Sequence, residues 1–171
     1  EQNSIPGLVN RILNRLSKLT FEAYPDSFNK SSKIHTVGNP VRSGIIKNPA
    51  TEAKKKEHFN ILILGGSQGS KQLNEIVLKA FKDKIIPSYW RIVHQTGELD
   101  KSSVADIYSK QSFSYEVVSY IEDIGRAYHE SDLVVGRSGA MTVSEICCSS
   151  KPSILFPLPW AADNHQYFNA K

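Results

Sequence analysis

A short apolar run that ends in a cluster of glycines and serines constrains the fold more than any other part of the sequence. The run Ile61–Leu64 leads directly into Gly65-Gly66-Ser67-Gln68-Gly69-Ser70, and a segment with helical spacing follows up to Lys82. An apolar strand that turns through glycines into a helix opens a βαβ unit. We therefore expect a strand at residues 59–64, a helix at residues 71–82, and a parallel sheet.

The alternation of strands and helices continues beyond this unit to residue 156. It predicts a doubly wound α/β domain, in which the loops at the carboxyl ends of the strands form the site. The further strands are expected at residues 90–95, 116–120, 133–136 and 153–156, and the further helices at residues 124–130 and 142–149.

The part before residue 59 has a different character. Leucine and isoleucine recur there at helical spacing with basic residues among them, which predicts an amphipathic helix from Gly7 to about Ala23. Its apolar stripe needs a partner surface, and packing against a core is a commoner use of such a stripe than lying on a membrane. Residues 24–51 have the composition of a connector, with one short β-like run at residues 34–37.

Composition limits the classes of function. The longest apolar runs are far shorter than the roughly 20 residues that a membrane-spanning helix needs. The net charge of +4 favours an anionic partner, which leaves nucleic acid, a phosphorylated metabolite and an acidic membrane surface open. Adjacent Cys147 and Cys148 suit neither a long-loop disulfide nor a zinc site, so we expect a reduced, cytoplasmic protein. A start without Met and an end inside a helical pattern predict a piece of a longer chain.

The loop Gly65–Ser70 has the composition of an anion site. Glycines let the backbone turn tightly and approach a phosphate, while free amides and the positive dipole end of the following helix face the anion. Ser67 adds a hydroxyl donor. The loop lacks the Lys-Ser/Thr ending of a Walker A motif and the G-x-G-x-x-G spacing of dinucleotide folds. A tight turn without a ligand remains the alternative.

A second loop of similar design follows a predicted strand at Gly136-Arg137-Ser138-Gly139. Ser138 and Thr142 suit the amides of the helix start. Glu145 lies farther along the same helix, and as a carboxylate it suits the two hydroxyls of a ribose. An ordinary acid that complements the helix dipole is the alternative for Glu145.

A third polar cluster follows the last predicted strand. Gln166 and Asn169 lie three residues apart on a helix, so their side chains can point the same way. Amides that both donate and accept suit the hydroxyls of a sugar, with helix caps as the alternative.

The three motifs, taken in order, closely resemble those of a known family. Gly-Gly-Ser-Gln-Gly-Ser is followed by Arg-Ser-Gly-Ala-Met-Thr-Val-Ser-Glu and then by Asp-Asn-His-Gln-Tyr-Phe-Asn-Ala, which resembles the MurG family of bacterial UDP-N-acetylglucosamine transferases of peptidoglycan synthesis. The similarity extends to Glu1–Gly7 and Val37–Arg42, so it spans essentially the whole chain.

The resemblance implies a GT-B architecture, in which two Rossmann-like domains face a cleft and the C-terminal one holds the sugar nucleotide. Residues 1–42 would be the C-terminal end of the N-terminal acceptor and membrane domain with its linker, and residues 43–171 a donor domain truncated at its C-terminus. No catalytic residue is expected in this chain, because the family's Gly-rich N-terminal loop with its acceptor-side histidine is absent from it. The chain alone would bind but not catalyse.

The resemblance also implies roles for individual residues. The diphosphate loop would be Gly65, Gly66, Ser67, Gln68 and Gly69. The second phosphate and nucleoside loop would be Ala140, Met141, Thr142, Val143 and Ser144. The backbone of Ile121 would contact uracil, and Glu145 the ribose. The remaining donor contacts would be Gln166 and Asn169 to N-acetylglucosamine, with Asn3 and Arg42 reaching across the cleft.

For the whole protein, the resemblance implies inverting transfer of N-acetylglucosamine from UDP to undecaprenyl-diphospho-muramoyl-pentapeptide, the step from lipid I to lipid II. It implies no metal, no cofactor and no nucleic acid partner, and a peripheral position on the cytoplasmic face of the bacterial inner membrane, with roles in cell wall biogenesis, cell shape and cell division. Three alternatives stay open: another GT-B glycosyltransferase, a UDP-sugar epimerase of a related fold, and a non-catalytic donor-binding subunit.

Overall fold

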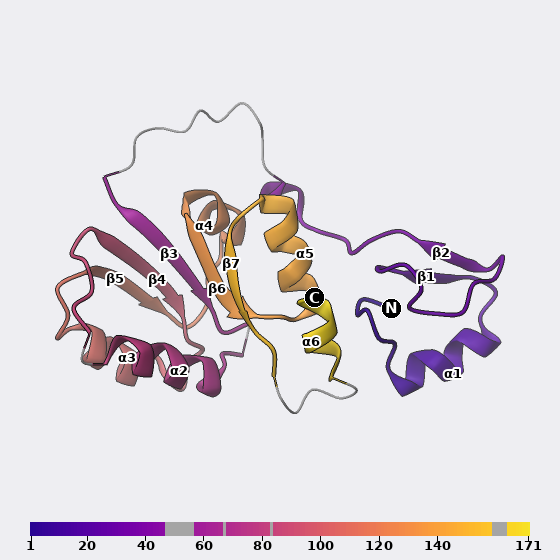
Figure 1. Ribbon diagram of the computed structural model, residues 1–171, viewed down its shortest axis with the longest axis horizontal. Coiled ribbons are helices and arrows are strands. Elements are labelled where there is room, and N and C mark those ends of the chain that lie inside the picture. Colours follow the sequence, from indigo (N-terminus) through magenta and orange to yellow (C-terminus); the bar gives the residue numbers. More distant parts are fainter. Residues whose placement is uncertain (47–56, 67, 83, 159–163) are drawn as a thin grey trace.

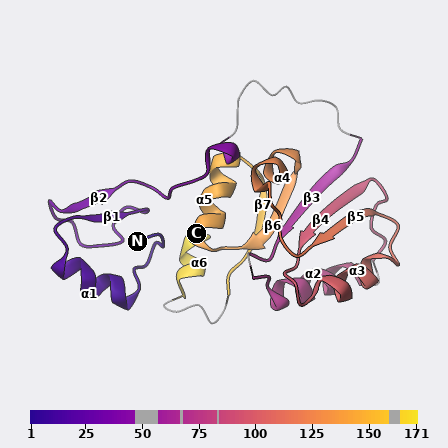
Figure 2. The same cartoon turned by 180° about the vertical axis from the view of Figure 1, so that it is seen from behind.

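The computed structural model describes residues 1–46, 57–66, 68–82, 84–158 and 164–171. They form a five-stranded parallel sheet with helices on both faces and a small unit at the N-terminus that lies beside it. Both views show this unit next to the last two helices, close to the C-terminus (Figure 1; Figure 2).

The sheet has the strand order β5-β4-β3-β6-β7, and all neighbouring strands are parallel. The strands are β3 (Phe59–Leu64), β4 (Trp90–Gln95), β5 (Ser114–Val118), β6 (Leu133–Arg137) and β7 (Ser153–Phe156). The chain starts in the centre, moves to one edge, and then crosses back to β6 on the other side of β3. This order confirms the predicted doubly wound α/β class, although β5 lies at Ser114–Val118 rather than at residues 116–120.

Helices cover both faces of the sheet. They are α2 (Lys71–Phe81), α3 (Lys101–Tyr108), α4 (Ile124–Glu130), α5 (Ala140–Ser149) and the short α6 (His165–Asn169). In Figure 1, α2 and α3 lie on one face, and α4 and α5 on the other. The pattern had predicted all of these except α3.

Alternation along the central strand explains why both faces are covered. Ile61 and Ile63 point into the core under α2 and α3, whereas Leu62 and Leu64 point into the core under α4 and α5. Successive side chains of a strand point to opposite faces, and a strand buried on both faces reads as a continuous apolar run. The run Ile61–Leu64 therefore fixes β3 as the central strand.

The N-terminal unit contains α1 (Leu8–Leu16) and a parallel pair of strands, β1 (Thr20–Glu22) and β2 (Ile34–Thr36). The predicted helix from Gly7 to about Ala23 is wrong beyond Leu16, because Ser17 is extended at φ −75° and ψ 146° and the chain then pairs with β2. None of the residues of α1 is buried, so its expected core partner is not among the described residues.

A short 3-10 helix, η1 (Ser43–Ile45), joins this unit to the sheet domain. Ile45 is fully buried in the core beside α4. A Cβ atom on Gly125 would lie 2.6 Å from the carbonyl oxygen of Gly44, so α4 needs a glycine at the point of contact. The tight contact fixes where residues before 46 enter the domain.

Candidate functional site

Two glycine-rich loops meet at the point where the strand order reverses. β3 and β6 are neighbours in the sheet, and Leu64 pairs with Gly136 near their carboxyl ends. The chain leaves β3 toward α2 and leaves β6 toward α5, so the two helix starts lie side by side. In open α/β sheets this switch point is where ligands bind.

The loop after β3 is held by hydrogen bonds to the end of β4. Gly65 N donates to Gln95 O at 3.0 Å, and the side-chain amide of Gln95 donates to Gly66 O at 2.7 Å. Gly66 and Gly69 have φ angles of 88° and 79°, which L side chains rarely adopt. Ser67, the hydroxyl donor predicted for this loop, lies outside the described residues.

Space as well as backbone conformation requires a glycine at position 69. A Cβ atom there would lie 2.2 Å from Thr96 O, and one on Gly65 would lie 2.9 Å from Gln95 O. Gly66 has open space around it, so only its positive φ favours glycine. The loop is therefore pressed against the turn that follows β4.

The start of α5 has backbone donors with no partner among the described residues. The first three amides of an α-helix have no partner inside the helix, and here they belong to Ala140, Met141 and Thr142. The cap residue Gly139 provides no side-chain hydrogen bond within the described structure. Ser138 is fully buried, and its hydroxyl has no partner among the described residues. An anion at this helix start would meet free donors and the positive dipole end.

Glu145 lies on α5 in a cavity of about 150 Å³ that the predicted uracil contact Ile121 also lines. The Tyr128 hydroxyl donates to Glu145 Oε2 at 3.2 Å. Burial raises the pKa of Glu145, and the hydrogen bond from Tyr128 and the charge of Arg42 pull it part of the way back. The carboxylate therefore sits half-buried with acceptor capacity to spare.

A second cavity, of about 310 Å³, spans both glycine loops. It shares Leu64, Gly66 and Thr142 with the cavity at Glu145, so the two are contiguous. Its remaining lining residues are Gly65, Gln68, Gly69, Arg137, Gly139 and Gln166. The structure thus brings the predicted diphosphate loop, the helix start of α5 and Gln166 around one space.

Arg137 is a lining residue that sequence reasoning missed. It ends β6, its Nε atom is buried without a partner among the described residues, and burial lowers its pKa. Its position directly before Ser138-Gly139, at the end of a predicted strand, was the available signal. A guanidinium at the edge of this cavity supplies the positive charge that an anionic ligand needs.

The predicted sugar contacts are already engaged with other parts of the chain. Asn169 Oδ1 accepts from the backbone and the hydroxyl of Ser4 at 3.0 and 3.1 Å. Its Nδ2 donates to Asn3 Oδ1 at 3.1 Å and to Ser138 O at 3.2 Å. Asn3 and Asn169 therefore meet each other, and this contact joins the N-terminal unit to the sheet domain. Gln166 Oε1 accepts from Leu158 N at 3.1 Å.

The other residues predicted from the second loop lie in the first turns of α5. Ala140 is buried, whereas Met141 and Val143 are half-buried. Ser144 accepts from Asn39 Nδ2 at 3.0 Å and so forms a second bond between the N-terminal unit and the domain.

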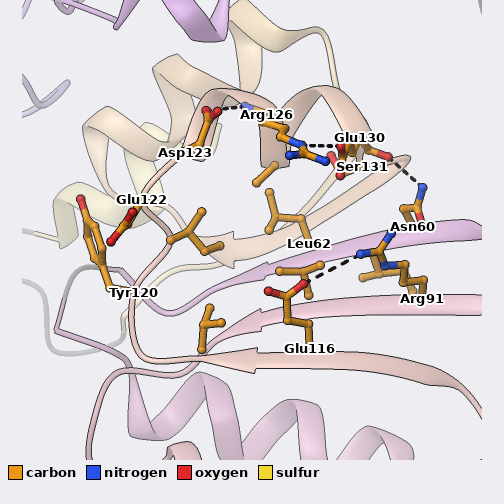
Figure 3. Close-up of a pocket in the computed structure, with 15 residues that line it drawn as sticks. Asn60, Leu62, Arg91, Glu116, Tyr120, Glu122, Asp123, Arg126, Glu130 and Ser131 are labelled. Carbon is orange, nitrogen blue, oxygen red and sulfur yellow. Dashed lines mark hydrogen bonds and ion pairs between the residues drawn. The ribbon is translucent and has the colours of Figure 1, made fainter.

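A further cavity, of about 320 Å³, lies on the sheet face beside α4 (Figure 3). Both arginines that line it are paired with carboxylates, Arg91 with Glu116 at 3.9 Å and Arg126 with Glu130 at 2.7 Å. No glycine is among its described lining residues, so it lacks the close backbone approach that a phosphate needs. We therefore place the site at the two glycine loops.

The described part of the chain contains no group of three or more His, Cys, Asp or Glu side chains that could hold a metal ion. Within the same ranges, no helix has both the length and the apolar character to cross a bilayer.

The fold is a doubly wound α/β domain with two glycine-rich helix starts at its switch point, where domains of this class bind their ligands. The profile of the glycosyltransferase family 28 C-terminal domain matches residues 60–171. The chain belongs to this family.

Curated relatives match over the whole chain. The UDP-N-acetylglucosamine--N-acetylmuramyl-(pentapeptide) pyrophosphoryl-undecaprenol N-acetylglucosamine transferase of Coxiella burnetii is 40% identical over 174 residues, covering 100% of this chain and 49% of the relative. The enzyme of the same name from Hydrogenovibrio crunogenus is 40% identical, covering 100% and 48%. The chain spans about half the length of these relatives.

Solved structures agree with this assignment. The crystal structure of Acinetobacter baumannii MurG matches with a TM-score of 0.78 and 35% identity, covering 99% of this chain and 48% of that one. The glycotransferase of kitacinnamycin matches with a TM-score of 0.58 at 18% identity, covering 91% and 39%, which shows the fold alone. The resemblance to the MurG family that the motifs indicated is confirmed.

Proposed function

We propose that the chain is the donor-binding part of a glycosyltransferase that takes N-acetylglucosamine from UDP-N-acetylglucosamine. The observation that carries this proposal is the contiguous pair of cavities that joins Glu145, the two helix starts and Gln166. A nucleoside diphosphate sugar has the same order of chemistry: a ribose with two hydroxyls, a diphosphate, and a sugar.

The diphosphate lies between the two helix starts in this proposal. The free amides of Ala140, Met141 and Thr142 and the guanidinium of Arg137 stabilise the charge that develops on the leaving UDP. Ribose binds at Glu145, uracil at the backbone of Ile121, and the sugar extends toward Gln166. This division of labour needs no metal ion, since helix dipoles and an arginine supply the positive potential.

The sugar end requires an exchange of hydrogen bonds. Asn169 contacts the sugar only after it gives up bonds to Asn3 or Ser4, because all its polar atoms are engaged. Asn3 and Arg42 approach the donor from the N-terminal side. The positive charge of Arg42 lies close enough to Glu145 to lower its pKa, which agrees with this position.

For the whole protein, we propose transfer to the muramoyl-pentapeptide of lipid I, with inversion, in peptidoglycan synthesis. The relatives' names specify this acceptor. Residues 1–42 belong to a second, acceptor-side domain, and the exposed apolar residues of α1 pack against the rest of that domain. The whole protein acts at the cytoplasmic face of the inner membrane as a peripheral enzyme that needs neither cofactor nor nucleic acid, whereas this chain alone binds the donor without transferring it.

Titration of UDP into the 171-residue chain tests the proposal. Glu145→Ala is expected to weaken UDP binding about tenfold, because each hydrogen bond to a charged group contributes about 1.5 kcal/mol or more. Glu75→Ala, on the exposed side of α2, is the matched control and should bind as the parent does. If the parent chain does not bind UDP, or if Glu145→Ala binds equally well, the proposed site is wrong.

A further inference from the structure

A buried chain of polar side chains lies directly beneath the diphosphate loop. His94 on β4 is fully buried, and Asn74 on α2 is 2% exposed. His94 contacts the Tyr108 hydroxyl through Nδ1 at 2.9 Å and Asn74 Oδ1 through Nε2 at 3.1 Å. These hydrogen bonds link α2, β4 and α3 inside the core that the three elements share.

The direction of each hydrogen bond is fixed. Asn74 donates both amide hydrogens, one to Thr96 O at 3.0 Å and one to Asp100 Oδ2 at 2.7 Å. Its Oδ1 must therefore accept from Nε2 of His94, whose Nδ1 then accepts from the Tyr108 hydroxyl. A neutral imidazole with its proton on Nε2 satisfies every partner in this arrangement.

The carbonyl oxygen of Thr96, which accepts from Asn74, is also the atom against which the diphosphate loop rests. A Cβ atom on Gly69 would lie 2.2 Å from Thr96 O, and one on Gly97 would lie 2.7 Å from Gln68 O. Two backbones that approach this closely move together. Asn74 holds Thr96, so it sets the position of Gly69 without touching the cavity.

Burying a histidine and an amide in this core costs desolvation free energy, which their hydrogen bonds offset in part. The core on this face of the sheet is otherwise built from apolar side chains, among them Leu73, Ile92 and Val104. Well-packed apolar residues of similar volume would avoid the desolvation of a histidine and an amide. Directional hydrogen bonds, in contrast, fix the turn after β4 in one position, which apolar contacts do not.

We propose that His94 and Asn74 are positioning residues that hold the turn at residues 95–97, and through it the diphosphate loop, in the geometry that binds the donor's diphosphate. This inference rests on the proposed function, because it assigns the loop to the diphosphate. It assigns the two residues no contact with the ligand. Their effect is confined to the part of the affinity that the phosphates contribute.

The test compares the affinities of the chain for UDP and for uridine by calorimetry. Uridine occupies the Glu145 end of the site without the diphosphate, so the ratio of the two affinities isolates the phosphate contribution. His94→Leu removes the donor to Asn74, and His94→Gln, of similar volume, retains an amide donor. Tyr108→Phe removes only the hydroxyl that holds the imidazole with its proton on Nε2.

His94→Leu is expected to lower the ratio about tenfold with little change for uridine, while His94→Gln stays within about twofold of the parent. Tyr108→Phe lowers the ratio about threefold, and it decides the matter if His94→Leu does not fold. Equal losses for UDP and uridine, or an unchanged ratio, overturn the inference while the proposed function stands. A parent chain that does not prefer UDP to uridine overturns both.

Discussion

The two helix starts at the switch point share a sequence signature but are built in opposite ways. The start of α2 has Gly66 and Gly69 at positive φ, and its own Ser70 accepts a hydrogen bond from Leu73 N. The start of α5 has Gly139 at an ordinary φ of −65°, with no side-chain cap in the described structure. A Cβ atom on Gly139 would meet nothing closer than Thr142 Oγ1 at 3.9 Å.

The two helix starts therefore differ in role: the loop before α2 shapes the cavity, whereas the start of α5 has the hydrogen-bond donors that stay free among the described residues. The loop before α2 is wedged against the turn after β4 and gives part of its donor capacity to its own cap, so it forms a fixed wall of the cavity. Within the described part of the chain, the first amides of α5 stay unpaired, so under the proposed function they supply the donors for an anion. Gly69 before α2 is thus required because a side chain would not fit there, whereas Gly139 before α5 leaves the helix amides without a side-chain cap.

The largest expected effect comes from a pair of matched substitutions. Gly69→Ala should destabilise the chain by about 3 kcal/mol or more and abolish UDP binding, because its Cβ atom overlaps a backbone carbonyl and its φ is left-handed. Gly139→Ala should cost only about 0.5 kcal/mol. Thermal unfolding and UDP titration of both variants measure the contrast. Similar losses in the two variants would show that the starts do not differ as described.

Acidification should loosen the start of α2, because it protonates His94. Burial lowers the pKa of His94 to about 4, against the opposing charge of Asp100, so the folded state binds a proton less readily than the unfolded state does. The stability that depends on neutral His94 is complete above pH 6.5 and is lost as the pH falls toward about 4. The loss amounts to about 3 kcal/mol in total.

Denaturant unfolding across this pH range measures that loss. The carboxylates of the chain titrate in part of the same range, so the informative quantity is the difference between the parent and His94→Gln. We expect this difference to fall steadily below pH 6.5. A difference independent of pH would mean that His94 is not held neutral in the core.

The contrast between the two starts also shows where sequence reasoning succeeds. The apolar run Ile61–Leu64 with its glycines was enough to predict β3, α2 and the parallel sheet, since burial on both faces leaves few other folds. The role of His94 could not be predicted, because a histidine in an apolar strand gives no sign of its partners on α2 and α3. Contacts between distant segments were equally hidden, as in Asn169 and Ser4, which are 165 residues apart.

Two local elements were missed for different reasons. α3 has serines and few apolar residues in its sequence, so its pattern is weak, although Val104 and Tyr108 are buried. β1 lies where Leu19 continues the helical spacing of α1, and only its pairing with β2 makes it a strand. In both, tertiary contacts outweigh local preference.

The cap of α2 should matter less than its glycine. Ser70→Ala removes the acceptor for Leu73 N, a contact of 3.4 Å, and should cost about 0.5–1 kcal/mol of stability. UDP binding should be retained or slightly improved, because the freed amide points toward the same helix start. Thermal unfolding and UDP titration check both effects. A loss of UDP binding larger than the loss of stability would mean that the Ser70 hydroxyl contacts the ligand.

The smallest expected change in stability is the most direct test of the start of α5. Gly139→Ser supplies the missing cap, so it should stabilise the chain by a few tenths of a kcal/mol. The new hydroxyl accepts from the amide of Met141 or Thr142 and thereby removes a donor from the anion site, which should weaken UDP binding about threefold. Gly139→Ala is the control, since it adds the Cβ atom without the acceptor. If Gly139→Ser gains stability but binds UDP as tightly as the alanine variant, the amides of α5 do not bind the diphosphate, and the donors must come from the loop before α2.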